Sequence, residues 1–271
     1  MPELPEVETI ARGLSRAVVG KTIDEAKVFL PKVVLPDPAT FRAGVAGEHI
    51  CTVGRRGKFV VFTFASGTRV AVHLRMTGRL LIRRADDNGT YPYENVRWLF
   101  SDGSLLSFAD IRQFGRMRLI EPGQPWDEIL GLEPLSRRFT RDRFSELLQG
   151  RTTPIKAFLL DQRRIAGIGN IYACEALWEA RIRPTRAAGS LSRERRERLH
   201  AALQSVLRRA ITMGGTSVDD YVNADGERGG FQNELSIYGQ DGEACPRCSA
   251  AIVRTVIAQR RTWWCRSCQR S

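Results

Sequence analysis

The sequence lacks the long apolar run that a membrane protein needs. Hydrophobic residues make up 42% of its 271 residues, yet no stretch approaches the ~20 consecutive apolar residues of a membrane span. The N-terminus, MPELPEVET, has no basic segment followed by an apolar one, so a secretory signal is not expected. Internal repeats and low-complexity tracts are also missing, which excludes repeat architectures. We predict a soluble protein of the cytoplasm, not bound to a membrane.

Lysine is scarce, although the chain is strongly basic. Only five of the 42 basic residues are lysines: Lys21, Lys27, Lys32, Lys58 and Lys156. A guanidinium does not release its proton usefully, whereas an amine can, so a lysine inside a motif indicates proton transfer. The net charge of +12 and pI near 10.0 point to a polyanionic partner, most simply nucleic acid. Residues 1–130 carry 18 basic and 15 acidic side chains, and residues 131–271 carry 24 and 15, so the positive charge is concentrated in the second half.

The first half combines one helix with strands. Residues 5–19 begin with a proline suited to the first helical turn and place apolar residues on one face, which predicts a helix. Its apolar face consists of Val7, Ile10, Ala11, Leu14 and Val18. From residue 21 to about 121 the apolar period shortens, with strands expected at Lys58–Phe64, Thr68–Leu74 and Arg79–Arg83 and turns at Ser66-Gly67 and Asp102-Gly103. These features predict a mostly antiparallel β sandwich with a leading helix.

The second half changes to helical spacing after a Pro- and Gly-rich linker at 122–134. An apolar stripe runs from Leu199 to Ile211 at spacings of three and four and stops at Gly214-Gly215. Residues 215–234 are rich in Gly, Asp and Asn and are predicted to form a long loop, and loops of that length are usually functional or disordered. The overall class is therefore α+β. We expect an N-terminal domain at 1–130, a helical domain at 131–234 and a small C-terminal unit at 235–271.

Two CxxC pairs lie in the C-terminal unit. Cys245 and Cys248 are followed, after sixteen residues, by Cys265 and Cys268, the spacing of a four-cysteine zinc site on a β hairpin. Disulfides and a redox CxxC are the alternatives; the cytoplasm disfavours the first, and the second needs no further pair. Four thiolates leave no open coordination position, so one structural zinc ion is predicted, and about thirty residues need its folding energy. Between the pairs, Trp263 and Trp264 are expected to pack the hairpin while arginines face outward.

The N-terminus offers an unusual nucleophile. Removal of Met1 would expose the secondary amine of Pro2, and an α-amine titrates near ~8, so a usable fraction is unprotonated at neutral pH. Such an amine can attack a sugar C1′ and form an iminium, with Glu3 beside it as an acid or base. The same Pro-Glu pair is also common at the start of an ordinary helix.

Six motifs favour a catalytic role for Pro2 over an ordinary helix start. They are MPELPEVET at the N-terminus, RRGKF at 55–59, HLRMTG at 73–78, DIRQFG at 110–115, GIGNIYACEAL at 167–177 and the closing QRRTWWCRSCQ. In this order, and over essentially the whole chain, they resemble bacterial formamidopyrimidine-DNA glycosylase. The resemblance implies an N-terminal β sandwich, a helix-two-turn-helix domain and a C-terminal zinc finger, with double-stranded DNA as the partner.

The resemblance also implies catalytic roles. Pro2 would attack C1′ of an oxidised purine nucleotide and Glu3 would protonate the sugar ring oxygen. Lys58 would donate a proton in β-elimination, and Arg260 would contact phosphate and assist δ-elimination. Glu6 matches a family residue near the base pocket, although it equally suits the dipole of a helix start.

DNA contacts are implied for two further sets of residues. Met76, Arg112 and Phe114 would fill the gap left when the damaged nucleotide is flipped out, which costs a few kcal/mol; ordinary strand core is the alternative for Met76 and Phe114. Contacts to the strand are implied for His73, Tyr93, Arg151, Lys156 and Asn170. The loop 215–234 resembles the segment that closes over the flipped base.

Two other functions remain open. Endonuclease VIII-like glycosylases share the fold and the proline chemistry but act on oxidised pyrimidines; the PELPEVET opening and the pattern of Met76 and Phe114 disfavour them. A non-catalytic zinc-finger protein that binds damaged DNA or RNA would have no use for Pro2 or Lys58. We expect a monomer, associated with the nucleoid, that acts on duplex DNA containing oxidised bases or abasic sites.

Overall fold

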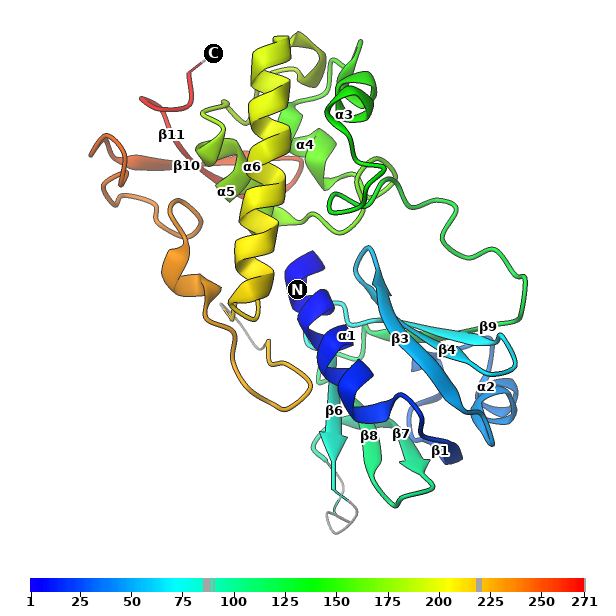
Figure 1. Cartoon of the computed structure of the whole chain (residues 1–271). Helices are drawn as coiled ribbons and strands as arrows, with labels where there is room; N and C mark the ends of the chain where they lie inside the picture. Colours follow the sequence, from blue (N-terminus) through cyan, green and yellow to red (C-terminus); the bar gives the residue numbers. More distant parts are fainter. Residues whose placement is uncertain (85–88, 90, 218–220, 271) are drawn as a thin grey trace. The chain divides into compact units, whose positions relative to one another are not determined.

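The computed structural model describes residues 1–84, 89, 91–217 and 221–270 (Figure 1). Contacts divide the chain into two compact units: unit 1 contains residues 1–127 and 213–232, and unit 2 contains residues 128–212 and 233–271. The division predicted from the sequence stays a prediction. Contacts group the residues differently: the segment 213–232 packs with the N-terminal part, and residues 235–271 are grouped with the helices of unit 2. Among the described residues, no helix combines the length and apolar character needed to cross a membrane.

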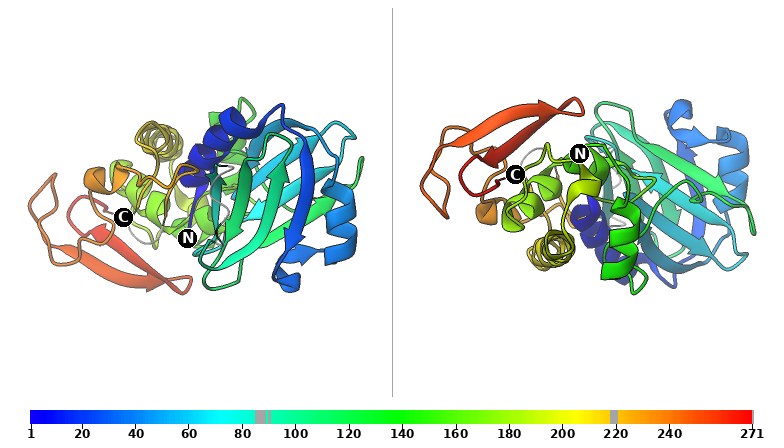
Figure 2. Two further views of the ribbon diagram at one scale, coloured as in Figure 1. Left: turned by 90° about the horizontal axis from the view of Figure 1, so that it is seen from below. Right: turned by 90° about the horizontal axis from the view of Figure 1, so that it is seen from above.

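Unit 1 is a two-layer β structure with two helices. A four-stranded sheet has the order β1-β7-β8-β6, and a five-stranded sheet has the order β2-β9-β5-β4-β3. The strands of both sheets are drawn in blue to green in Figure 2. All neighbouring strands are antiparallel except β2 and β9. The elements are α1 (Leu4–Val18), β1 (Ile23–Val28), η1 (Pro31–Val33), β2 (Val34–Leu35), α2 (Pro38–Val45), β3 (Ile50–Arg56), β4 (Phe59–Phe64), β5 (Arg69–His73), β6 (Arg79–Arg83), β7 (Glu94–Phe100), β8 (Leu105–Ala109) and β9 (Arg116–Ile120).

The core of unit 1 lies between the two sheets, which confirms the predicted sandwich. Trp98 of β7 packs edge-on against Phe62 of β4, with ring centroids 5.0 Å apart, and both side chains are fully buried. The apolar face of α1 enters the same core: all five residues predicted for it are buried. Apolar burial on this scale is the main stabilising contribution to the unit.

Helix α2 is absent from the sequence prediction. Asp37 caps it by accepting hydrogen bonds from the backbone N–H groups of Ala39 and Thr40 at 2.9 and 3.0 Å, and Pro38 occupies the first turn. Both are standard start signals. The helix has only eight residues, too few for a clear apolar period.

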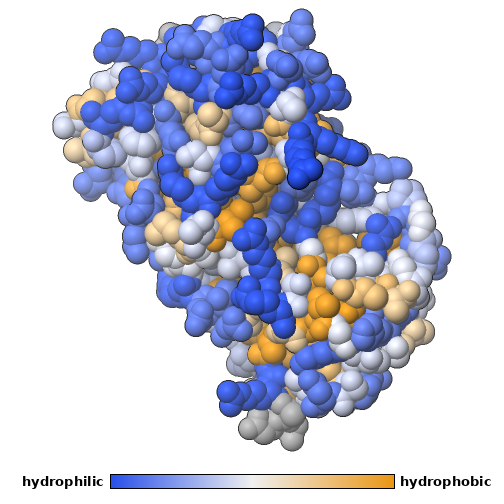
Figure 3. Space-filling model, viewed as in Figure 1, coloured by the Kyte–Doolittle hydropathy of each residue, from blue (hydrophilic) through white to orange (hydrophobic). Residues whose placement is uncertain are grey.

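Unit 2 is helical and ends in a β hairpin. Its elements are α3 (Arg141–Leu148), α4 (Ile155–Leu160), α5 (Asn170–Glu179), η2 (Ala188–Ser190), α6 (Arg193–Thr212), β10 (Ile252–Ile257) and β11 (Arg260–Cys265); η3 (Phe231–Glu234) joins the two units along the chain. The apolar stripe of α6 is buried as predicted, except that Ile211 is only partly covered. Hydrophilic side chains cover much of unit 2 on the face drawn in Figure 3, in keeping with its arginine content.

Candidate active site and nucleic-acid interface

The chain start is fixed by a reciprocal cap on α1. Glu3 is the N-cap residue, and its backbone N–H donates to Glu6 Oε2 at 2.7 Å. The other oxygen of Glu6 accepts a hydrogen bond from Thr216 N at 2.8 Å. Pro2, Glu3 and Glu6 are all buried. Burial of two carboxylates is costly unless hydrogen bonds satisfy them, so Glu6 both caps the helix and holds the segment 213–232.

Lys58 lies in the turn between β3 and β4, and hydrogen bonds connect this turn to α1. Arg55 Nε donates to Glu8 Oε2 of α1 at 2.9 Å, while Arg55 Nη1 donates to Gly57 O at 2.9 Å. Burial by itself would raise the pKa of Glu8, but the hydrogen bonds and charges of Arg55 and Arg12 outweigh it and lower the pKa. Arg55 thus couples the helix that follows Pro2 to the turn that carries the buried Lys58.

His73 ends β5 next to the Lys58 turn. It pairs with Phe59 across the sheet, and the two rings meet edge-on at 4.7 Å. Burial, followed by the charges of Arg75 and Lys58, lowers the pKa of His73 to about 3. Its Nδ1 accepts a hydrogen bond from Arg75 N at 3.0 Å. The imidazole is therefore neutral and carries its proton on Nε2, which leaves one N–H donor for a ligand.

The structure brings the three predicted gap-filling residues together; we call Met76, Arg112 and Phe114 the insertion side chains. Met76 is 44% exposed and Phe114 51% exposed, so neither belongs to the core. Arg112 joins them: its Nη1 lies 3.0 Å from Met76 Sδ, and its guanidinium carbon lies 5.0 Å from the centre of the Phe114 ring. Exposed apolar side chains clustered around one arginine suit contact with a base or its partner.

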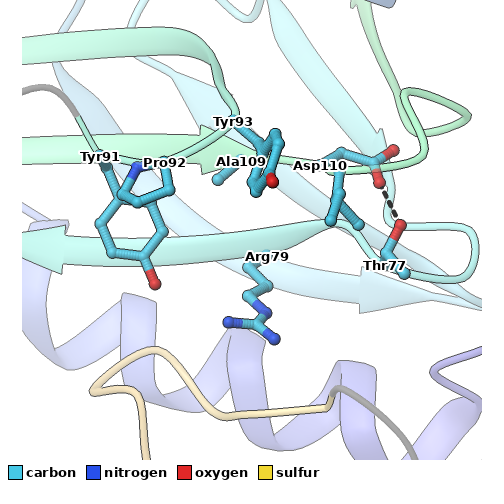
Figure 4. A pocket seen from close by; sticks show the side chains of 8 residues that line it. Thr77, Arg79, Tyr91, Pro92, Tyr93, Ala109 and Asp110 are labelled. Carbon is cyan, nitrogen blue, oxygen red and sulfur yellow. Dashed lines mark hydrogen bonds between the residues drawn. The ribbon is translucent and has the colours of Figure 1, made fainter.

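Tyr93 lines a cavity of about 280 Å³ (Figure 4), whose lining also includes Thr77 and Ile111, the chain neighbours of Met76 and Arg112. Its side chain is 60% exposed, and its backbone has a φ of 59°, which is rare for a bulky residue. Thr77 and Asp110 line the same cavity and are hydrogen-bonded to each other. Ile111, which is 52% exposed, also lines this cavity and directly precedes Arg112 in the chain. The sequence patterns did not indicate a role for it.

The loop 215–234, expected to close over a flipped base, belongs to unit 1 up to residue 232; its residues 218–220 lie outside the described residues. Ser217 Oγ donates to Tyr221 O at 3.0 Å and accepts from Gly229 N at 2.9 Å. Tyr221 OH donates to Gly214 O at 3.0 Å, and burial together with the charge of Glu6 raises the pKa of Tyr221. The base of the loop is thus closed by its own hydrogen bonds.

The four predicted zinc ligands converge. The sulfur atoms of Cys245, Cys248, Cys265 and Cys268 all lie within 4.8 Å of one another, and none of the six cysteines, all within the described residues, forms a disulfide. The Trp178 indole N–H points at Cys245 Sγ from 3.4 Å, and Cys268 N points at Cys265 Sγ from 3.4 Å. N–H groups aimed at sulfur suit thiolates, so the site fits one structural zinc ion.

Two residues predicted to contact the DNA strand meet at one carbonyl within unit 2. Lys156 is fully buried, and its Nζ donates to Thr262 Oγ1 at 2.6 Å and to Arg261 O at 3.1 Å. Asn170 Nδ2 donates to the same Arg261 O at 3.0 Å. In this geometry Lys156 anchors β11 and does not face solvent.

Arg260 is exposed at the start of β11. The turn before it consists of Ala258 and Gln259, both with positive φ, as a two-residue type I′ turn requires. Trp263 and Trp264 are 7% and 5% exposed, which confirms that the aromatic pair packs the hairpin. Arg151, also predicted to contact DNA, is exposed in the segment after α3.

Glu175 of α5 is a buried carboxylate to which the sequence assigned no role. It accepts backbone hydrogen bonds from Ser236, Ile237 and Tyr238 at 3.0, 3.0 and 2.9 Å. Burial raises its pKa despite these donors. Its acidic side chain within the otherwise apolar IYACEAL segment was the only signal available. Glu175 fixes the chain that leads into the finger.

Three family models match consecutive parts of the chain. They are the formamidopyrimidine-DNA glycosylase N-terminal domain over residues 1–117, the formamidopyrimidine-DNA glycosylase H2TH domain over residues 130–222, and a zinc finger found in FPG and IleRS over residues 242–270.

Full-length relatives agree with these matches. A formamidopyrimidine-DNA glycosylase from Enterococcus faecalis is 43% identical over 274 residues, covering 99% of this chain and 97% of the relative. A Lactococcus lactis FPG variant, solved in complex with DNA containing Fapy-dG, aligns with a TM-score of 0.93 at 36% identity over 100% of both chains. A solved structure of MutM with DNA containing carbocyclic 8-oxo-G aligns with a TM-score of 0.91, again at 36% identity over 100% of both chains.

Proposed function

The chain belongs to the formamidopyrimidine-DNA glycosylase family, and from that premise we propose that Pro2 is the nucleophile with which it excises damaged bases. The protein is a DNA glycosylase of base excision repair that removes oxidised purines. One observation carries the assignment to Pro2: this residue directly precedes the cap formed by Glu3 and Glu6, whose hydrogen bonds fix the start of α1. A nucleophile has to be held in place in this way to attack a single carbon atom.

The reaction starts from the mature chain, after Met1 has been removed. The lone pair on the Pro2 nitrogen forms a bond to C1′ as the bond between C1′ and the base breaks, and the base leaves with the electron pair. The departing base takes up the proton from the Pro2 nitrogen, and Glu3 protonates the ring oxygen as its bond to C1′ breaks, which gives an iminium between Pro2 and C1′. The positive nitrogen acidifies the protons on C2′, which permits elimination. Because Pro2 itself displaces the base, no water nucleophile is required.

Strand cleavage follows from the iminium. Loss of a C2′ proton expels the 3′ phosphate, and a second elimination expels the 5′ phosphate. We assign proton donation in the first elimination to Lys58, whose buried amine lies on the turn coupled to α1 through Arg55. Arg260, exposed on the hairpin, is assigned to the phosphate that leaves in the second step.

Access to C1′ requires that the nucleotide leave the duplex, at a cost of a few kcal/mol. The insertion side chains suit the gap, because a thioether and an aromatic ring can replace stacking while the Arg112 guanidinium pairs with the orphaned cytosine. His73, Tyr93, Arg151 and Asn170 are the proposed strand contacts. The loop 215–234 is proposed to cover the extruded purine.

The four cysteines would hold zinc in a saturated site, so the ion supplies folding energy and no reaction step. The arginines of the hairpin are then available for phosphate. The predicted partner is duplex DNA containing oxidised bases or abasic sites, bound by a monomer at the nucleoid. Binding should weaken steeply as salt rises.

Borohydride trapping on an 8-oxoguanine:cytosine duplex tests the proposal. Wild-type enzyme should form a covalent adduct, and peptide mass analysis should place the reduced sugar on the N-terminal Pro2. Pro2→Gly should excise the base far more slowly, because a primary amine replaces the held pyrrolidine. Pro5→Ala, which changes the next proline in the same segment, should retain the adduct.

Three outcomes would count against the proposal. An adduct on a side chain with an unmodified terminus would exclude Pro2 as the nucleophile. Normal nicking by wild-type enzyme with no trapped adduct would exclude the covalent route altogether. Efficient cleavage of a thymine-glycol duplex with none of the 8-oxoguanine duplex would favour the pyrimidine-specific class.

A further inference from the structure

Asp110 is a buried carboxylate for which the proposed reaction has no use. It directly follows β8 and is 1% exposed. Its Oδ2 accepts a hydrogen bond from Gly115 N at 2.7 Å, and its Oδ1 accepts from Arg112 N at 3.2 Å. An ionised carboxylate remains in such a place only when its oxygens are satisfied, and here the donors come from the loop that carries Arg112 and Phe114.

The carboxylate also reaches a second loop. Thr77 Oγ1 donates to Asp110 Oδ1, as the dashed line in Figure 4 shows, and Arg112 N lies 3.3 Å from the same hydroxyl. Thr77 follows Met76 in the connection between β5 and β6. One hydroxyl therefore links the loop that presents Met76 to the loop that presents the other two insertion side chains.

The main chain of Asp110 holds a third segment. Its N–H donates at 3.0 Å to the carbonyl of Tyr93, the residue whose positive φ needs external support. Its carbonyl accepts from Asn95 Nδ2 at 3.3 Å and from Gln113 N at 3.2 Å. Asp110 thus has hydrogen bonds to three separate segments, and each of them carries a proposed DNA contact.

The packing around Asp110 leaves no room for a side chain at Gly115. A Cβ atom there would lie 2.5 Å from the Phe108 ring and 3.1 Å from Asp110 Oδ2. Glycine is required because the backbone itself approaches the carboxylate. The loop from 110 to 115 is therefore seated closely on Asp110 before any DNA is bound.

We propose that Asp110, through Thr77, is a positioning residue that holds the insertion side chains in one arrangement before the duplex is entered. The inference rests on the proposed function and adds a specific device to it. Three side chains on two loops would otherwise lose conformational freedom during base extrusion, the step that already costs free energy. Hydrogen bonds formed in advance remove that cost from the binding event.

Thr77→Val is the test variant, because it keeps the size of the side chain and removes only the hydroxyl. Excision from an 8-oxoguanine:cytosine duplex should slow by about tenfold, as expected for loss of a hydrogen bond to a charged group. Cleavage of an abasic site in single-stranded DNA should keep its wild-type rate, since no partner base is orphaned there. Thr77→Ser, which restores the hydroxyl, should recover most of the duplex activity.

A spectroscopic readout follows insertion directly. With 2-aminopurine next to the orphaned cytosine, the rise in fluorescence on mixing should be slower for Thr77→Val than for wild type or Thr77→Ser. Thr68→Val is the matched control, because it removes a hydroxyl that bonds Ser66 in a turn at the other end of β5. It should behave like wild type in both assays.

Each other result decides against the inference. Equal duplex rates for Thr77→Val and wild type would show that the link is dispensable. Equal losses on duplex and single-stranded substrates would show damage to folding or chemistry instead of positioning. A Thr77→Ser variant as slow as Thr77→Val would show that the hydroxyl is not responsible. Failure of the proposed function is distinguishable, because it is seen in wild-type enzyme alone, as a trapped adduct away from Pro2 or as nicking without any adduct.

Discussion

The β sandwich of unit 1 and the hairpin of unit 2 hold their functional residues by different means. In the sandwich, a large apolar core supports buried groups such as Glu3, Glu6 and Lys58. In the finger, only a small cluster of apolar residues packs with Cys245 and Cys265, and the exposed Arg260 lies on a strand anchored by Lys156 and Asn170. The residues assigned to covalent chemistry thus lie on a domain with its own apolar core. Arg260, assigned to a phosphate contact, lies on a hairpin that needs a metal ion to fold.

The largest expected effect comes from removal of one zinc ligand. Cys248→Ser should release the metal and unfold the hairpin, because structural zinc contributes about 10 kcal/mol or more to such small units. DNA affinity should fall by about a hundredfold or more at moderate salt, since the phosphate contacts of the finger are lost with it. Metal analysis and fluorescence anisotropy would measure both effects. The sandwich should still unfold cooperatively.

Cys51→Ser is the matched control for that experiment. Cys51 is exposed in β3, far along the sequence from the finger, so zinc content and affinity should stay at wild-type levels. Full zinc stoichiometry in Cys248→Ser would rule out the four-thiolate site.

The opposite experiment removes apolar packing from the sandwich. Trp98→Ala should lower the free energy of unfolding by about 3–5 kcal/mol, because the ring is buried against Phe62 and Phe64, while zinc content stays unchanged. Urea denaturation would measure the loss. Trp98→Phe should cost much less, since the Trp98 Nε1–H has no hydrogen-bond partner among the described residues. Loss of zinc from Trp98→Ala would contradict the separation between the two regions.

This contrast also explains which features the sequence could predict. Apolar periods identified the face of α1, the strands from β4 to β6 and the stripe of α6, because burial imposes a repeat on neighbouring residues. The cysteine spacing identified the finger. The parallel pairing of β2 with β9 left no such repeat.

Contacts between distant residues were not predictable in the same way. Lys156 lies 105 positions from Arg261, with which it bonds, and Thr77 lies 33 positions from Asp110. Motif resemblance marked several of these residues as functional. It did not distinguish a residue that touches DNA from one that holds a neighbouring strand, since both are polar side chains within the same motifs.

Lys156 gives a sharper test of that distinction. A lysine that contacts phosphate adds about one unit to the slope of log affinity against log salt. Because its ammonium is used inside unit 2, Lys156→Met should weaken binding by about tenfold without changing that slope. Arg151→Met, which removes an exposed guanidinium, should reduce the slope by about one. A reduced slope for Lys156→Met would instead place the lysine on the DNA.

The smallest expected effect concerns the dependence of stability on pH. The pKa of His73 falls from 6.5 to about 3 on folding, through burial and then the charges of Arg75 and Lys58. Between these two values the unfolded chain binds a proton that the folded chain does not, so this histidine lowers stability as the pH falls through that window. His73→Gln should therefore lose less stability than wild type when the pH is lowered from about 7 to about 4.

Thermal unfolding at several pH values would measure this difference, with His49→Gln as the control, because His49 is exposed on the same unit. The expected change is small, since His73 is only partly buried and solvent reduces the effect of nearby charges.

Nitrogen NMR of the His73 ring supplies an independent measure: Nδ1 should remain unprotonated down to about pH 4, as its hydrogen bond from Arg75 N requires. If Nδ1 instead gained a proton near pH 6, the neutral, single-donor state of His73 would be wrong, and His73 could not act as the strand contact in that form.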